Sequence, residues 1–199
     1  MRIIDGIGQL EALYGQVNPL AIAKVARRLT PLYARWVAAS RFAILATVGP
    51  DGTDCSPRGE DGPVVRIADP QTLLLPDWPG NNRLDSLRNI VRDGRASLMF
   101  LVPGSDIVIR TNGRAVVTDD PDVTARFERN GRRPRSVIVF RIGEVYFQCA
   151  KALMRAGLWS APTPEGLPSA GQLLREADGS FDAEAFDRGF PDLARDSLW

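Results

Sequence analysis

Three segments combine residue types that could bind a small anionic ligand, and the first runs from Pro76 to Arg83. A strand is expected to end at Pro76, and a loop with Gly80, Asn81 and Asn82 leads into a helix. The start of a helix offers free N–H groups and a partial positive charge, and arginine adds a two-pronged cation, which together suit a phosphate. The simpler alternative is that Asn81 and Asn82 cap the helix and that Arg83 is solvated.

The second segment is Ser56-Pro57-Arg58-Gly59, which directly follows a short expected strand. Pro57 restricts one backbone angle, whereas Gly59 permits the close approach of a flat ligand. Arg58 would then be presented to a ligand from a stiff loop. An ordinary turn at the end of a strand is the alternative.

The third segment begins after Gln148 and ends at Trp159. If it is helical, Lys151 and Arg155 lie four residues apart on one face, and Trp159 follows four residues later. Two like charges at this spacing repel each other weakly, and an anion facing both would turn that repulsion into attraction. Solvent exposure of both side chains is the alternative.

Histidine is absent from all 199 residues. This absence excludes Ser-His-Asp triads, Cys-His pairs and metal sites that use imidazole, and it disfavours haem, which usually needs an axial histidine. The two cysteines cannot complete a zinc site without histidine. We therefore expect no metal and assign no catalytic residue, so any reaction would rely on a bound cofactor.

The charge balance gives no sign of a polyanionic partner. Lysine and arginine number 25 and the acidic residues 24, so neither nucleic acid nor an anionic membrane is expected to bind. The arginines between Arg126 and Arg135 are expected to form a solvated face, with nucleic-acid binding as the minor alternative. The longest apolar run, residues 98–102, is too short for a membrane span, and Asp5 and Glu11 interrupt any signal-peptide core. We expect a soluble cytoplasmic protein.

The elements that must position these segments can be read from periodicity and turn residues. Helical spacing predicts helices within residues 7–39, including one that continues through residues 20–29 and one that Thr30-Pro31 starts. Short apolar runs between turn signals then predict strands over 42–48, 53–56, 64–67, 72–75, 95–102, 107–118 and 136–148. Further helices are expected over 82–93, 121–130 and 150–156, and Gly143 is expected to form a bulge. The pattern indicates an antiparallel barrel or sandwich.

Taken together, four motifs in order make the chain resemble the FMN-binding split-barrel flavoproteins of the pyridoxamine 5′-phosphate oxidase superfamily. The closest resemblance is to a bacterial branch of FMN-dependent enzymes, and it covers residues 41–159. The motifs are Ser56-Pro-Arg-Gly-Glu60, Asp69-x-x-Thr72-Leu-Leu-Leu-Pro76 with Gly80-Asn-Asn-Arg-Leu-Asp85, Arg110-Thr-Asn-Gly-Arg-Ala115, and Cys149-Ala-Lys-Ala with Leu158-Trp159.

The resemblance implies an α+β fold built on an antiparallel six-stranded split β-barrel with flanking helices. It also implies a homodimer with two FMN sites at the interface. Residues near the flavin ring and ribityl chain would be Ser56, Pro57, Arg58, Gly59, Leu75 and Pro76. The phosphate would be held by Gly80, Asn81, Asn82 and Arg83, and the flavin of the other subunit would be reached by Lys151, Arg155 and Trp159.

These expectations divide the chain into an N-terminal helical segment (1–40), an FMN-binding split-barrel domain (41–159) and a C-terminal arm (160–199) whose packing is not assigned. The expected function is that of an FMN-binding oxidoreductase that passes hydride or electrons to a small-molecule substrate. Because flavin carries the chemistry itself, a chain without histidine can support it. The alternative is a carrier or sensor that binds flavin or deazaflavin without turnover.

Overall fold

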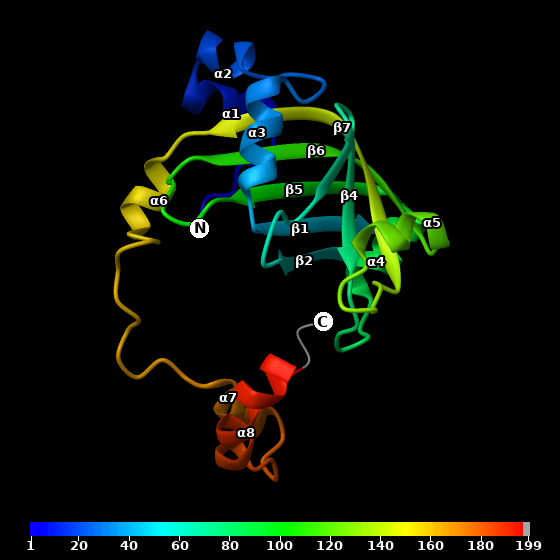
Figure 1. Cartoon of the computed structure of the whole chain (residues 1–199). Coiled ribbons are helices and arrows are strands. Elements are labelled where there is room, and N and C mark those ends of the chain that lie inside the picture. The colour runs from blue at the N-terminus through cyan, green and yellow to red at the C-terminus, as the bar shows by residue number, and fades with distance from the viewer. Residues whose placement is uncertain (197–199) are drawn as a thin grey trace.

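The computed structural model describes residues 1–196 and consists of one curved antiparallel sheet with helices around it (Figure 1). The seven strands follow the order β2-β1-β5-β6-β7-β4-β3. Their bounds are Phe42–Gly49 (β1), Gly52–Gly59 (β2), Arg66–Asp69 (β3), Thr72–Asp77 (β4), Arg95–Leu101 (β5), Val108–Thr118 (β6) and Ser136–Gln148 (β7). The structure is therefore α+β, as expected.

The six strands that the resemblance implies are one too few, whereas the apolar runs predict the observed number of seven. The additional strand, β3, forms one edge of the sheet. β3 pairs only with β4, starting with Arg66 opposite Leu74. The strand expected over residues 64–67 therefore begins two residues later. The Val64 N–H instead donates a hydrogen bond to the carbonyl of Ser40 at 2.8 Å, and the Val64 side chain is fully buried in the core.

The curvature of the sheet brings its two ends toward each other. β2 lies at one edge, and β4 is second from the other edge. In Figure 1, β4 runs across the ends of β1 and β2. The helix α4 (Asp85–Arg92) packs on β1, β2 and β6 at this place.

The hairpin of β6 and β7 contains the bulge that the sequence predicts at Gly143. Asn112 pairs with Glu144 and Gly113 pairs with Ile142, so Gly143 is the extra residue. At this irregularity the two strands approach closely. A Cβ on Gly113 would lie 2.0 Å from the carbonyl oxygen of Arg141.

The main core lies on the concave side of the sheet and is closed by α3 (Pro31–Ala39). Alternating strand residues such as Leu45, Phe100 and Phe140 are fully buried, and so is Val37 of α3. The predicted start of α3 is confirmed, because the Thr30 hydroxyl accepts a hydrogen bond from the Tyr33 N–H.

The helix expected to continue through residues 20–29 is wrong. α1 covers Ile7–Tyr14, but α2 ends after five residues (Pro19–Ala23). The chain then becomes extended, because Ala26 exchanges two backbone hydrogen bonds with Val145 at the bulged part of β7. Sheet pairing therefore overrides the helical spacing of the apolar residues here.

Five further elements complete the described chain. The helix expected over 121–130 is shorter, with α5 (Pro121–Thr124) and a 3₁₀ turn, η1 (Ala125–Phe127). α6 covers Lys151–Ala156 and agrees with the expected helix within one residue. The C-terminal region forms α7 (Ala170–Ala177) and α8 (Ala183–Asp196), and the end of the expected arm, 197–199, lies outside the described residues.

Within residues 1–196, no helix is long and apolar enough to cross a membrane.

The bulge gives a test of the fold. We expect Gly113→Ala to lower the free energy of unfolding by about 1–3 kcal/mol, because the new methyl group collides with backbone that cannot turn away. Gly62→Ala is the matched control, because a Cβ there meets nothing within 4 Å. Urea unfolding of both variants measures the difference. Equal stability of the two variants would contradict the close approach of β6 and β7.

Candidate functional site

A cavity of about 880 Å³ opens where the two ends of the sheet approach each other. Its walls come from β2, the end of β4, the loop that follows β4, and the first turn of α4. The lining residues are Asp54, Ser56, Arg58, Asp77, Trp78, Pro79, Gly80, Asn81, Asn82, Arg83, Leu84, Asp85, Ser86, Leu87, Arg135 and Ser136. Its volume falls in the range of about 300–1,000 Å³ that is usual for small-molecule sites.

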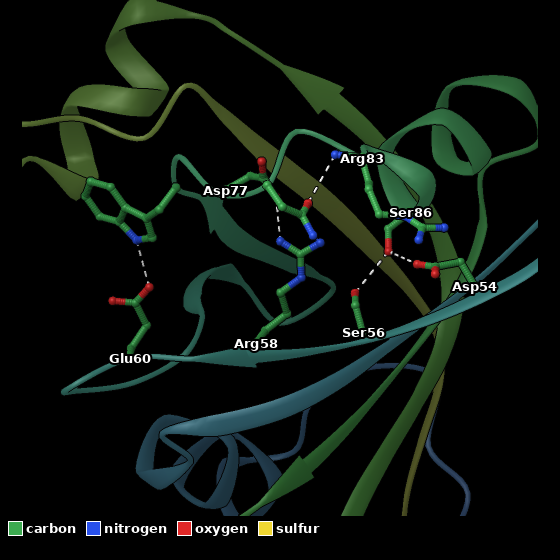
Figure 2. A network of polar contacts seen from close by, with 9 residues as sticks. Asp54, Ser56, Arg58, Glu60, Asp77, Arg83 and Ser86 are labelled. Carbon is green, nitrogen blue, oxygen red and sulfur yellow. Dashed lines mark hydrogen bonds and ion pairs between the residues drawn. The ribbon is translucent and has the colours of Figure 1, made fainter. Parts of the chain in front are cut away.

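Strand alternation places four polar side chains of β2 and its end on one side of the strand. Asp54, Ser56, Arg58 and Glu60 all turn toward β4 and α4, as Figure 2 shows. The residues between them are exposed, because successive side chains of a strand point to opposite faces. β2 therefore presents a row of polar groups to the cavity.

Arg58 and Asp77 form the ion pair that joins the two ends of the sheet. The Nη1 atom of Arg58 lies 2.5 Å from Oδ1 of Asp77, and the side chains are only 20% and 15% exposed. The Nε–H of Arg58 is buried and has no hydrogen-bond partner among the described residues. Buried donors are nearly always satisfied, so this N–H indicates that an acceptor belongs in the site.

A chain of hydroxyl groups links β2 to α4. Ser86, in the first turn of α4, is 4% exposed and donates a short hydrogen bond to Asp54. The Ser56 and Ser86 hydroxyl oxygens lie 3.0 Å apart, so the Ser56 hydroxyl completes the chain by donating to Ser86. The chain fixes α4 against the edge strand and sets the position of the helix start beside the cavity.

Glu60 and Trp78 form a second link between the same two parts of the chain. The Trp78 indole donates to Oε1 of Glu60 at 2.8 Å, and Arg129 lies 3.6 Å from the other carboxylate oxygen. Burial raises the pKa of the Glu60 carboxyl, while the Trp78 hydrogen bond and the Arg129 charge oppose this increase. The contacts hold the indole at the wall that separates the cavity from a second hollow beside Phe127.

The prediction that Asn81 or Asn82 caps the helix is wrong. α4 begins at Asp85, and its N-cap is Leu84, which has a left-handed φ of 62° and makes no side-chain cap. Asn81 instead accepts a hydrogen bond from the N–H of Arg83, and Asn82, with φ of 58°, accepts one from Arg135. The two amides therefore stabilise the conformation of the loop. The negative charge of Asp85 interacts favourably with the partial positive charge at the start of α4.

Arg83 lies at the mouth of the cavity rather than inside it. Its side chain is 77% exposed, and its Nε donates to Asp85 at 2.8 Å. In Figure 2 its guanidinium lies beside Ser86 and Asp54, which line the same cavity. An anion could therefore meet Arg83 and the first turn of α4 at one point.

The structure brings six of the predicted binding residues to this cavity: Ser56, Arg58, Gly80, Asn81, Asn82 and Arg83. Pro57 and Gly59 are exposed on the opposite side of β2. Leu75 and Pro76 are buried in β4, below the cavity wall.

The remaining three predicted residues, Lys151, Arg155 and Trp159, lie elsewhere in the same chain. They are exposed on α6 and just after it, and α6 and α4 lie at opposite ends of the sheet's strands in Figure 1. The Trp159 indole donates to the carbonyl of Ser105 at 2.9 Å. Within one chain, these residues do not contribute to the cavity.

Sequence reasoning missed several residues that line the cavity, chiefly Asp54, Asp77, Trp78, Ser86 and Arg135. Every second residue of a strand lies on the same face, so Ser56 and Arg58 could have indicated that Asp54 also faces the ligand. Asp77 and Trp78 lie inside a segment that the sequence did single out. Arg135 gives no local signal, because the fold alone brings it to Asn82.

The cavity combines hydrogen-bond donors with flat and apolar walls. Arginine, asparagine and backbone groups lie near the start of α4, and Trp78 and Leu87 provide apolar surface. Among residues 1–196, no group of three or more His, Cys, Asp or Glu side chains could hold a metal ion. The site therefore suits an organic anion with a flat part.

Several solved structures are similar to this chain. HupZ from Group A Streptococcus aligns with a TM-score of 0.50 and 15% identity over 60% of this chain and 98% of its own. An FMN-binding protein from Syntrophomonas wolfei aligns with a TM-score of 0.44 and 14% identity, covering 71% of this chain and 98% of its own. General stress protein 26 from Bacillus anthracis gives a TM-score of 0.41 and 14% identity, covering 57% and 88%. No curated protein matches the sequence.

The family model described as pyridoxamine 5′-phosphate oxidase matches residues 29–149, which is more than half of the chain. The matched region begins just before α3 and ends just after β7, so it contains the whole sheet, α4 and the cavity. By this match, the chain belongs to the pyridoxamine 5′-phosphate oxidase family of the FMN-binding split-barrel superfamily.

Proposed function

We propose that this protein binds FMN in the cavity between β2, β4 and α4 and transfers hydride or electrons to a small-molecule substrate. The observation that carries the proposal is the buried, unpartnered Nε–H of Arg58 inside a cavity whose mouth is lined with anion-binding groups. Membership of a flavin-binding superfamily supports the same ligand class.

The phosphate of FMN would lie at the mouth, where the loop meets α4. Arg83 and the first N–H groups of α4 would hold it there, with Asn81, Asn82 and Arg135 behind them. The guanidinium of Arg83 is accessible, and within residues 1–196 it pairs with Asp85 alone, whose side chain is 39% exposed, so a phosphate can compete for it. The start of one helix suits a single phosphate group. FMN has one phosphate, whereas FAD has a diphosphate with an adenosine attached, so the site favours FMN.

The flat ring would lie deeper, toward the ion pair that bridges the sheet. Arg58 would donate its free N–H to the ring and stabilise negative charge there. Ser56 would offer a hydroxyl beside it, and Leu75 and Pro76 would support the ring from β4. Bound FMN supplies the hydride and electron transfer itself, so the chain has to bind, orient and tune it.

We also propose that two copies complete each other's sites in a homodimer of split barrels. Lys151 and Arg155 are four residues apart on α6, far from their own cavity, and an anion facing both would offset their repulsion. Large apolar side chains near them, such as Met154 and Leu158, are 63% and 51% exposed. A symmetric partner would cover these side chains and bring α6 to the other cavity.

The identity of the ligand is the first test. We expect the purified protein to carry FMN, released by heat and identified by mass, because the single helix start beside Arg83 would hold one phosphate. Reduction of the bound flavin by nicotinamide or deazaflavin donors without oxygen would support turnover. A flavin that no donor reduces would support a carrier or sensor, and a colourless protein that fails to bind added FMN would contradict the proposal.

Arg83→Ala tests the phosphate position. We expect FMN to bind more weakly by about 1.5–3 kcal/mol, or roughly 10- to 150-fold, because a charge-assisted hydrogen bond is lost. Riboflavin, which lacks the phosphate, should bind the variant and the parent protein equally. Arg133→Ala is the control, since Arg133 is half exposed and paired with Glu128 outside the cavity. Fluorescence titration measures the affinity for each ligand. An unchanged affinity of Arg83→Ala for FMN would mean that Arg83 faces solvent and does not hold the phosphate.

A mixing experiment tests whether the site is shared. One chain carries Arg83→Ala, and the other carries Lys151→Ala with Arg155→Ala. If each site uses both chains, a mixed dimer has one site with both defects and one intact site. About a quarter of all sites should then bind FMN tightly after full exchange of equal amounts. Recovery of no tight sites in an exchanged mixture would mean that each chain builds its own site.

A further inference from the structure

The two C-terminal helices form a unit of their own, here called the C-terminal helix pair (residues 169–196). A capping box at Ser169 and Gln172 starts α7, and Asp187 of α8 accepts hydrogen bonds from Ser169 and from the Gly171 N–H. Phe186 and Phe190 stack with their ring centres 5.1 Å apart. These contacts fix the two helices against each other.

The helix pair has too small a core to be stable alone. Between Ala170 and Arg195, only Gly171 and Ala183 are buried. Large apolar side chains remain open to solvent, with Leu173 at 56% and Phe190 at 45% exposure. Helices of eight and 14 residues depend on packing for their stability, so this apolar face requires a partner surface.

The sheet of the same chain does not provide that surface. Both hydrophobic clusters of the described chain consist of residues up to Val145, and the helix pair lies apart from the sheet in Figure 1. The family match also ends at residue 149, so the pair is an addition to the shared fold.

Charge restricts what the partner surface can be. Residues 160–199 contain eight acidic and three basic residues, a net charge of −5. The first 159 residues therefore carry a net charge of +6, given +1 for the whole chain. The helix pair is thus complementary in charge to the rest of this same sequence.

The outer face of α4 has the matching chemistry. Leu84, Arg88 and Val91 are spaced by four and three residues, so they form one stripe along the helix. Leu84 and Val91 are 44% and 75% exposed, and the Arg88 side chain has no hydrogen-bond or ion-pair partner among residues 1–196. The opposite face of α4 is buried through Ser86 and Ile90. The stripe can therefore accept an acidic, apolar helix surface.

The length of the linker between Trp159 and the helix pair favours docking of the pair on a second copy over docking within the same chain. Trp159 donates a hydrogen bond to Ser105, which lies just before the first residue of β6, Val108. The cavity lies near the other end of β6, because Ser136, which lines it, begins β7 beside Thr118. An 11-residue strand spans about 33 Å, and the nine residues between Trp159 and the helix pair reach at most about 30–32 Å. A fully stretched linker within one chain would therefore hardly reach the cavity.

We propose that the C-terminal helix pair of one copy docks on the outer face of α4 of a second copy and covers the cavity there. This inference rests on the shared-site dimer proposed above, in which α6 already approaches the other cavity. The acidic side chains of the pair then face Arg88, and its leucine and phenylalanine side chains cover Leu84 and Val91. Each cavity is closed by the chain that does not build it.

Zero-length carbodiimide cross-linking tests this contact, because the chain has only two lysines, Lys24 and Lys151. Arg88→Lys places an amine in the stripe while it keeps the charge, and Arg28→Lys is the control at an exposed position in the N-terminal segment. Equal amounts of ¹⁵N-labelled and unlabelled full-length chains are exchanged, loaded with FMN and cross-linked. Mass spectrometry then shows whether the two peptides of each cross-link come from labelled or unlabelled chains.

We expect links from position 88 to the acidic residues of the helix pair, with about half of them joining a labelled to an unlabelled peptide. The Arg28→Lys control should give no such links. Links within one isotope only, or none at position 88, would overturn the proposed docking. Light scattering and FMN titration of the same sample separate this failure from that of the dimer, because a dimer that binds FMN without these links refutes the docking alone.

Discussion

The ion pair of Arg58 and Asp77 is the interaction on which the site depends. It joins an edge strand to a strand that is not its neighbour in the sheet, so it closes the gap that the curved sheet leaves. Both charges are largely withdrawn from water, and such a pair is stable only when each partner is present and well bonded. With the pair intact, the hydroxyl chain at Ser86 and the indole of Trp78 lie at fixed distances from the cavity.

The elements that sequence alone predicts well are those with a strong local pattern. Apolar runs gave β1, β5 and β7 nearly their full lengths, and Thr30-Pro31 marked the start of α3 because both residues act through neighbouring backbone. Gly143 was predicted as a bulge because a glycine inside a long strand commonly marks one. In these places, local preference and tertiary structure agree.

The errors arise where distant contacts decide the local conformation. Residues after α2 have helical spacing, but Val145 pairs with Ala26 and pulls the chain into an extended form. Asn82 has the composition of a helix cap, but its hydrogen bond from Arg135, 53 residues away, keeps it in the loop. The strand expected over 64–67 is shifted to β3 (Arg66–Asp69), because its residues pair with β4 while Val64 hydrogen-bonds to the distant Ser40. Six of the 16 residues that line the cavity were predicted, because they lie in two continuous segments of the sequence, and the others required the fold.

The position of Pro57 has a consequence for how copies of this chain can associate. It lies within β2, one of the two edge strands of the sheet, and proline has no N–H to offer to a further strand. An exposed edge without such an interruption is a template for sheet extension and for amyloid-like growth. Pro57 therefore protects the β2 edge beside the cavity, so other chains are not recruited there into a continuous sheet.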